Sequence, residues 1–219
     1  MTREETTACR AVGLAAAAGL GYRLLLRRRM LDWGATRGEA RGPLPGDELL
    51  ADPDVVSTRA VTIAAPPSAV WPWLVQMGPG ERGGAYSYDW IENLLGLDMH
   101  SVDRVLPQFQ HVAAGDVVPD RHGKPWLRFE RVEPERMLAL RSADGSWVWS
   151  FVLVEQAGWT RLLSRNRIRT GRSPFARLGL GLMVPGSLVM ERKMLLGIRA
   201  RAERLAADRA EREPAATSA

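Results

Sequence analysis

The sequence contains one cysteine, Cys9, and three histidines in 219 residues. A single cysteine cannot build an internal disulfide framework or a cysteine-based zinc site. The histidines, His100, His111 and His122, recur every eleven residues. That spacing does not place two metal ligands on one face of a helix or a strand. The sequence therefore predicts no metal site.

A dinucleotide-binding pattern in its proper context is also missing. Residues 78–83 read Gly-Pro-Gly-Glu-Arg-Gly, which formally matches G-x-G-x-x-G. The fingerprint needs a strand before it and a helix that begins within it. Here a helix is predicted before the motif, and Pro79 lies inside it. We interpret this segment as a loop between two short helices and predict no cofactor.

An excess of basic residues is almost absent outside the N-terminal segment. Residues 1–29 contain six arginines and two glutamates, which account for +4 of the net charge of +5. A nucleic-acid-binding domain carries its basic residues on the fold itself. The nearly neutral body of this chain therefore predicts no nucleic-acid partner.

No long uninterrupted hydrophobic run is present. The most apolar segment, residues 11–26, has 16 residues and contains Arg23, whereas a transmembrane helix needs roughly 20 apolar residues. Three arginines follow at 27–29, and such a cluster favours anionic headgroups on the cytoplasmic side. We expect residues 11–29 to hold a cytoplasmic protein at the inner face of the cell membrane. An ordinary alanine-rich helix packed on the domain is the alternative.

The apolar content of 46% is enough to build one ordinary globular core. We expect residues 1–31 to form an apolar helix with a basic flank. Residues 32–55 are rich in glycine, proline and aspartate and predict a linker. Residues 56–212 then form one domain, and residues 213–219 form a disordered polar tail.

The order of the predicted elements indicates the fold class. A strand at 56–64 precedes a helix capped by Ser68 and a second short helix at 88–95. Pro185-Gly186 is expected to break the apolar segment that precedes it. A long amphipathic helix then runs from Ser187 towards Arg212. Between the short helices and the long one, alternating apolar residues predict strands at 116–118, 126–132, 137–141, 147–155 and 159–170. This order predicts an α+β helix-grip fold, a curved antiparallel β-sheet wrapped around the C-terminal helix.

The strand at 159–170 separates two kinds of side chain. Its arginines occupy odd positions from 161 to 169, whereas Ser164 and Asn166 occupy even positions with apolar neighbours. Because strand side chains alternate between faces, we expect the arginines on a solvated outer face and the even residues on the inner wall. The apolar even residue Leu162 joins that wall. Ser164 and Asn166 either contact a ligand or simply bond neighbouring groups, and the sequence favours neither.

Asp89 and Glu92 lie three residues apart on the second short helix and share a face. Such a pair could act as acid and base in a cyclisation or a dehydration. The favoured interpretation is a solvated helix face, with Trp90, Ile91 and Leu94 buried on the opposite side.

Several segments resemble the START-like or SRPBCC superfamily, in particular its uncharacterised bacterial members. They are AAPPSAVWPWLVQMG, RGGAYSYDWIENLLG, HVAAGDVVP, VEPERMLAL, SWVWSFVLVE and MERKMLLGIRARAE, and the resemblance spans about residues 33–208. It implies an apolar cavity between the sheet and the C-terminal helix but no shared set of catalytic residues. We therefore expect a carrier or sensor of a small hydrophobic ligand, such as a lipid or a polyketide. A polyketide cyclase or dehydratase is the alternative, and the lack of a strong proton carrier on the predicted wall argues against it.

The expected lining of the cavity combines the resemblance with the strand and helix periodicity. It consists of Trp73, Met77, Tyr88, Trp147, Trp149, Phe151, Leu162, Ser164, Asn166, Met194 and Ile198. No catalytic residue is assigned.

Overall fold

The computed structural model describes residues 21–22, 26–171 and 174–216. Most of the apolar segment at 11–26, for which membrane attachment is expected, lies outside these residues. The described helices include none that is both long enough and apolar enough to cross a membrane.

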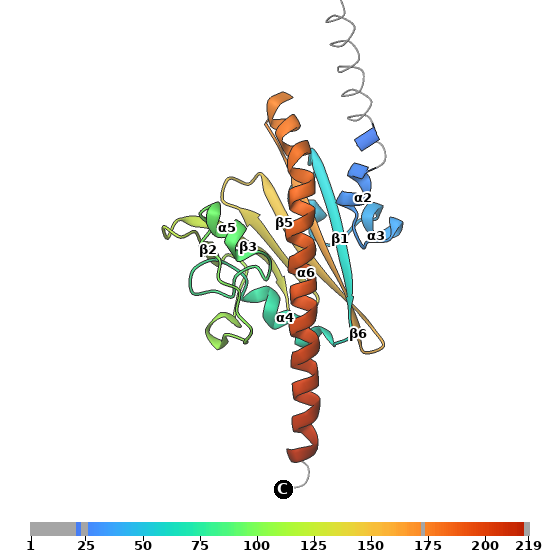
Figure 1. Cartoon of the computed structure of the whole chain (residues 1–219), viewed down its shortest axis with the longest axis vertical. Coiled ribbons are helices and arrows are strands. Elements are labelled where there is room, and N and C mark those ends of the chain that lie inside the picture. The colour runs from blue at the N-terminus through green and yellow to red at the C-terminus, as the bar shows by residue number, and fades with distance from the viewer. Residues whose placement is uncertain (1–20, 23–25, 172–173, 217–219) are drawn as a thin grey trace, which may run out of the picture.

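A six-stranded antiparallel sheet forms the body of the protein (Figure 1), and its strand order is β1-β6-β5-β4-β3-β2. β1 therefore pairs with the last strand of the chain, and the other strands follow one another as a meander. The strands are β1 (Val55–Ile63), β2 (Val117–Pro119), β3 (Pro125–Glu133), β4 (Met137–Ser142), β5 (Trp147–Gln156) and β6 (Trp159–Ile168). This sheet and the long C-terminal helix confirm the predicted helix-grip fold.

The helices α4 (Pro67–Val75), α5 (Asp89–Leu94) and α6 (Pro174–Ala216) lie on one face of the sheet, which we call the inner face. A short 3₁₀ helix, η3 (Pro107–Phe109), follows α5. Figure 1 shows α6 running across the whole sheet, with α4 and α5 beside it. The main hydrophobic core lies beneath these helices and includes the fully buried Leu195 and Ile198 of α6.

The ends of two helices differ from the prediction. α4 begins at Pro67, so Pro66 and not Ser68 is its N-cap. Pro72 lies inside α4 and cannot bond the Ser68 carbonyl, which instead accepts a hydrogen bond from Arg209 at 3.3 Å. The expected cap at Ser68 was therefore wrong, because the helix starts two residues earlier than that cap implies, with a proline at its first position.

The long helix also begins earlier than predicted. α6 starts at Pro174 and continues through Pro185 and Gly186, where a break was expected. Val184 before this pair and Glu191 after it are both buried, and such tertiary packing overrides a local preference against helix. The helix runs on to Ala216, into the segment expected to be a disordered tail.

The segment that precedes β1 begins with α2 (Arg27–Leu31), which packs against α6 and β1. The chain then passes to the opposite, outer face of the sheet, which α3 (Arg37–Arg41) and the 3₁₀ helix η2 (Asp47–Leu50) cover. Leu44 and Leu49 pack on a second apolar cluster that includes Met137 and Leu163. Residues 32–55, which were expected to be a linker, are thus packed against the sheet.

The arginine row of β6 lies beneath this covering segment. Arg165 is only 3% exposed and bonds Asp47 at 2.6 Å and the Gly42 carbonyl at 3.0 Å. Arg161 binds the carboxylate of Glu39 through two nitrogens, each at 2.9 Å. The expected solvated face was therefore wrong, since residues 34–51 supply carboxylates and carbonyls that satisfy the guanidinium groups.

Candidate functional site

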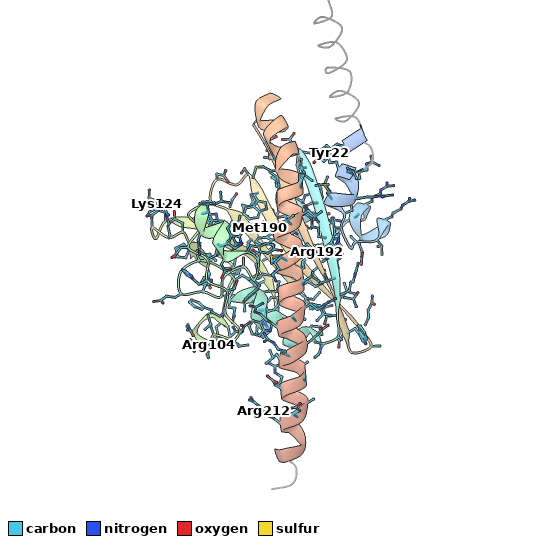
Figure 2. The ribbon with its side chains drawn as sticks, viewed as in Figure 1. Tyr22, Arg104, Lys124, Met190, Arg192 and Arg212 are labelled. Atoms are coloured by element: carbon cyan, nitrogen blue, oxygen red, sulfur yellow. The ribbon has the colours of Figure 1, made fainter. Side chains whose placement is uncertain are left out.

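A cavity of about 250 Å³ lies between the inner face of the sheet, α6 and α5. Figure 2 shows Met190 on the side of α6 that faces α5, and Arg192 on the other side. Met190 is half-buried and Ser187 is exposed, so the cavity reaches the surface beside this part of α6. Its lining consists of Ser57, Arg59, Ala85, Ser87, Glu92, Trp147, Trp149, Asn166, Ile168, Ser187, Met190, Glu191 and Met194.

One wall of the cavity is aromatic and is built by alternate residues of β5. The rings of Trp147 and Trp149 stack at 5.4 Å with an interplanar angle of 23°. Phe151 continues the row, 4.8 Å from Trp149 between ring centroids. The indole N–H of Trp147 donates to Asn166 Oδ1 and that of Trp149 to Ser164 Oγ, both at 2.9 Å. These bonds fix the two rings, and the wall can present flat apolar area to a ligand.

Another part of the cavity lining is a buried polar cluster around Glu191 of α6. Its carboxylate forms an ion pair with Arg59 of β1. The Ser164 hydroxyl donates to Glu191 Oε1 at 2.6 Å, and the Asn166 amide donates to both carboxylate oxygens at 3.2 Å. Burial raises the pKa of Glu191, and the nearby Arg59 charge and these hydrogen bonds act in the opposite direction.

Arg59 has additional partners that tie α2 and α6 to the sheet. Its Nε donates to the Met30 carbonyl of α2 at 3.1 Å, and its Nη2 donates to Ser187 Oγ at 3.0 Å. The side chain is 1% exposed, so these bonds replace the water that the charge has lost. The cluster is therefore a satisfied structural network that also forms part of the cavity wall.

Strand register explains why these residues meet. Arg59 of β1 pairs with Ser164 of β6, which in turn pairs with Phe151 of β5. In the next row, Asn166 pairs with Ser57 on one side and Trp149 on the other. Residues paired across antiparallel strands share a face, so polar and aromatic side chains line the inner face together.

The structure corrects the predicted orientation of α5. Glu92 is 7% exposed and lines the cavity, whereas Trp90 and Leu94 are 69% and 80% exposed. Asp89 is held elsewhere, because its carboxylate accepts hydrogen bonds from the backbone N–H and the hydroxyl of Ser101 at 2.7 and 2.6 Å. These contacts turn the carboxylate side of the helix inwards, so the expected burial of Trp90 and Leu94 was wrong.

The side chain of Glu92 has one hydrogen-bond partner among the described residues. The Ser87 hydroxyl donates to Glu92 Oε1 at 2.6 Å, while Oε2 is buried and accepts no hydrogen bond from any described group. Burial raises the pKa of Glu92 most strongly, and the Asp89 charge raises it further, against the opposing effect of Ser87.

A smaller cavity of about 30 Å³ adjoins the first. Ala85 and Trp149 line both, so they form the partition between them. The other lining residues are Leu74, Met77, Gly78, Met99, Val118, Trp126, Leu127, Leu140 and Phe151.

The residues expected to line a cavity are distributed over these two spaces and the core. Trp147, Trp149, Asn166 and Met194 line the larger cavity, and Met77, Trp149 and Phe151 line the smaller one. Ser164 bonds Trp149 and Glu191 from behind the wall. Trp73, Leu162 and Ile198 are buried in the hydrophobic core, and Tyr88 is half-buried with Lys193 Nζ 5.8 Å from the centre of its ring.

Arg59, Glu92 and Glu191 are cavity residues that were not among those predictions. Glu191 precedes Met194, Ile198 and Ala202 by three, seven and eleven residues, so helical periodicity alone could have placed it on the buried face. Arg59 alternates with Ser57 and Val61 on β1, and this period-two pattern is the corresponding signal. No three metal-ligating side chains are grouped together in the described part of the chain.

No protein-family model matches the chain, and none of the curated proteins matches it either. Among solved structures, the chain is similar to protein SSP2350 from Staphylococcus saprophyticus, with 14% identity, 68% of this chain and 92% of that chain covered, and a TM-score of 0.42.

The chain is also similar to the polyketide-cyclase-like protein Cgl2372 from Corynebacterium glutamicum, at 14% identity, with 69% and 88% of the two chains covered and a TM-score of 0.34. An AHSA1-like protein from Aeromonas hydrophila gives 15% identity, coverage of 66% and 93%, and a TM-score of 0.35. Because these identities and TM-scores are low, the fold assignment rests on the strand order and the long C-terminal helix of this chain.

Proposed function

We propose that this chain binds a small, mainly hydrophobic molecule in the cavity between the sheet and α6, as a carrier or sensor of that molecule. The observation that carries the proposal is the aromatic wall. Trp147 and Trp149 stack on each other with their polar N–H groups already bonded, so their free ring area is apolar. Rings and short acyl chains are the ligand parts that such a wall favours.

The size of the cavity limits the ligand. About 250 Å³ lies below the roughly 300–1,000 Å³ usual for drug-sized molecules. The site therefore suits one small ring system or a section of a longer lipid or polyketide chain.

Equilibrium dialysis of the purified full chain with 2-naphthol, a small ring-bearing probe, tests the proposal. At about 0.5 kcal/mol per non-hydrogen atom, between the limits for tiny and drug-sized ligands, this probe should bind at roughly 0.1 mM. Ala85→Leu adds bulk to the cavity wall and should weaken binding at least tenfold. Ala143→Leu adds the same bulk at an exposed turn position and should leave binding unchanged. Equal binding by both variants would contradict this location.

The second candidate function is an enzyme of the cyclase or dehydratase type. The observation in its favour is Glu92, a buried carboxylate at the cavity with a raised pKa, which is the property of a general acid. Asp89, the other member of the proposed pair, is engaged by Ser101. A single free carboxylate favours binding over two-residue acid–base catalysis.

For location, we propose that residues 11–29 attach a cytoplasmic protein to the inner face of the cell membrane. Arg28 and Arg29 support this because both are exposed in α2, directly after the apolar segment. Each arginine near an anionic surface contributes about 1 kcal/mol. The variant Arg28→Gln/Arg29→Gln should sediment at least tenfold less with phosphatidylserine-containing vesicles than the wild type. The control Arg128→Gln/Arg199→Gln changes two other exposed arginines, and an equal loss in both would contradict the attachment site.

A further inference from the structure

We propose that the cavity selects ligands that carry a hydrogen-bond donor, a hydroxyl or an amino group, and that Glu92 Oε2 accepts the hydrogen bond from that donor. This inference rests on the proposed function and specifies the chemistry of the ligand. The juxtaposition of the unpartnered carboxylate oxygen with the stacked tryptophan wall carries it.

The carboxylate group of Glu92 is buried without being fully satisfied. The residue is 7% exposed, and Oε1 has its bond from Ser87, whereas Oε2 receives none from the described residues. A buried carboxylate oxygen without a donor is costly, and native structures rarely leave one without a functional reason. Glu92 lines the cavity although Oε2 itself is buried, so a small rotation of the carboxylate lets Oε2 meet a bound molecule that supplies the missing donor.

The other charged groups of the cavity are already matched. Arg59 and Glu191 neutralise each other, and Glu191 accepts additional bonds from Ser164 and Asn166. The indole N–H groups of the wall are likewise occupied by Ser164 and Asn166. Glu92 is thus the carboxylate of this cavity that retains hydrogen-bonding capacity towards a ligand.

The carboxylate of Glu92 disfavours anionic ligands. Glu92 has no cation bonded to it among the described residues, and the Arg59 charge is paired with Glu191. An ionised Glu92 would therefore place a negative charge without a paired cation beside a ligand carboxylate or phosphate, which is unfavourable. The site accordingly favours a phenol, an alcohol or an amine attached to an apolar ring or chain.

Equilibrium dialysis with three probes of nearly equal shape tests the inference. 2-Naphthol offers a hydroxyl donor, 2-methoxynaphthalene offers the same oxygen without a donor, and naphthalene has no polar group. Hydrogen bonds to charged groups contribute about 1.5–3 kcal/mol. The wild-type chain should therefore bind 2-naphthol at least tenfold more tightly than either other probe.

Substitution of Glu92 separates the donor effect from general hydrophobic binding. Glu92→Leu should bring the three affinities within about threefold of one another. Glu92→Gln preserves the shape of the side chain and guards against a folding defect in the leucine variant. It should reduce the preference for 2-naphthol at least threefold, because the amide acceptor is uncharged. Glu81→Gln, the same change at an exposed loop position, should retain the full preference.

The outcomes that would overturn the assignment of Glu92 differ from the outcome that would contradict the proposed function. If the wild type binds all three probes with equal affinity, the cavity is a hydrophobic binding site and the assignment of Glu92 is overturned. If Glu92→Leu and Glu92→Gln both keep the tenfold preference, the donor is recognised elsewhere and the assignment is again overturned. If no probe binds at concentrations up to 1 mM, about ten times the expected dissociation constant, the proposed function itself is contradicted, and this inference with it.

Discussion

The ion pair between Arg59 and Glu191 predicts an asymmetric response to substitution. Glu191→Leu removes the carboxylate but leaves a guanidinium that is 1% exposed and cannot release its proton. Removal of one partner of a buried pair typically costs about 3–5 kcal/mol. We expect a loss of stability in that range at every pH at which the wild type is folded.

Arg59→Met should cost less, because Glu191 can take up a proton where Arg59 cannot. The remaining carboxyl keeps its bonds to Ser164 and Asn166. Burial already raises its pKa, and loss of the opposing Arg59 charge raises the pKa further. A carboxyl whose folded-state pKa exceeds its unfolded value contributes stability that is present below the unfolded pKa and is lost as pH rises through the folded pKa. The cost of Arg59→Met should therefore be smaller at pH 5 than at pH 8.

The double variant Arg59→Met/Glu191→Leu completes the cycle. It leaves no buried charge in the cluster, so its stability should lie within about 2 kcal/mol of the wild type. Urea unfolding followed by far-ultraviolet circular dichroism measures all four proteins. Additive costs of the two substitutions, or a cost below about 1 kcal/mol for Glu191→Leu, would refute the buried pair as described.

Three other substitutions test the packing of α6 and the environment of α5. Ile198→Asp places a charge in the core and should lower the free energy of unfolding in urea by several kcal/mol. Ala200→Asp, on the exposed side of the same helix, should lower it little. Equal losses would mean that α6 does not cover the sheet in this orientation. Gly197→Ala should also destabilise the protein, because a Cβ there would lie 2.5 Å from the Tyr86 carbonyl oxygen, and an unchanged unfolding midpoint would argue against this close approach. Glu92→Gln should become more stable relative to the wild type as pH rises from 4 to 8, since the raised pKa of Glu92 means that stability is lost as its carboxyl ionises; a difference independent of pH would contradict the burial of this group.

Local periodicity was sufficient to predict the fold, because each major element carries a long pattern. The alternation of Trp147, Trp149 and Phe151 placed three rings on one face, and the three- and four-residue spacing of α6 placed Met194 and Ile198 against the sheet. The same two periodicities also place Arg59 on the inner face of β1 and Glu191 on the buried face of α6. A charge on a single strand or helix argues against burial, and the packing of α6 against β1 brings these two charges together as a pair.

The covering segment and α5 could not be predicted in this way. Residues 34–51 have no sustained apolar period, and much of their docking relies on backbone carbonyls that accept hydrogen bonds from arginines of β4 and β6. Sequence patterns do not report which carbonyls a distant arginine will reach. α5 has only six residues, too few for a clear amphipathic pattern, and the contact between Asp89 and Ser101 decides which side faces inwards.

Native mass spectrometry of the full chain, purified from the cells that naturally produce it, tests the central claim most directly. The claim is that a small molecule occupies the cavity beside Trp147 and Trp149. The wild type should carry a non-covalent ligand with an apolar body and a hydroxyl or amino group, and Ala85→Leu prepared in the same way should have lost it. Retention of the same ligand by Ala85→Leu at undiminished occupancy, or a wild-type chain that is free of ligand at its native expression level, would contradict the account.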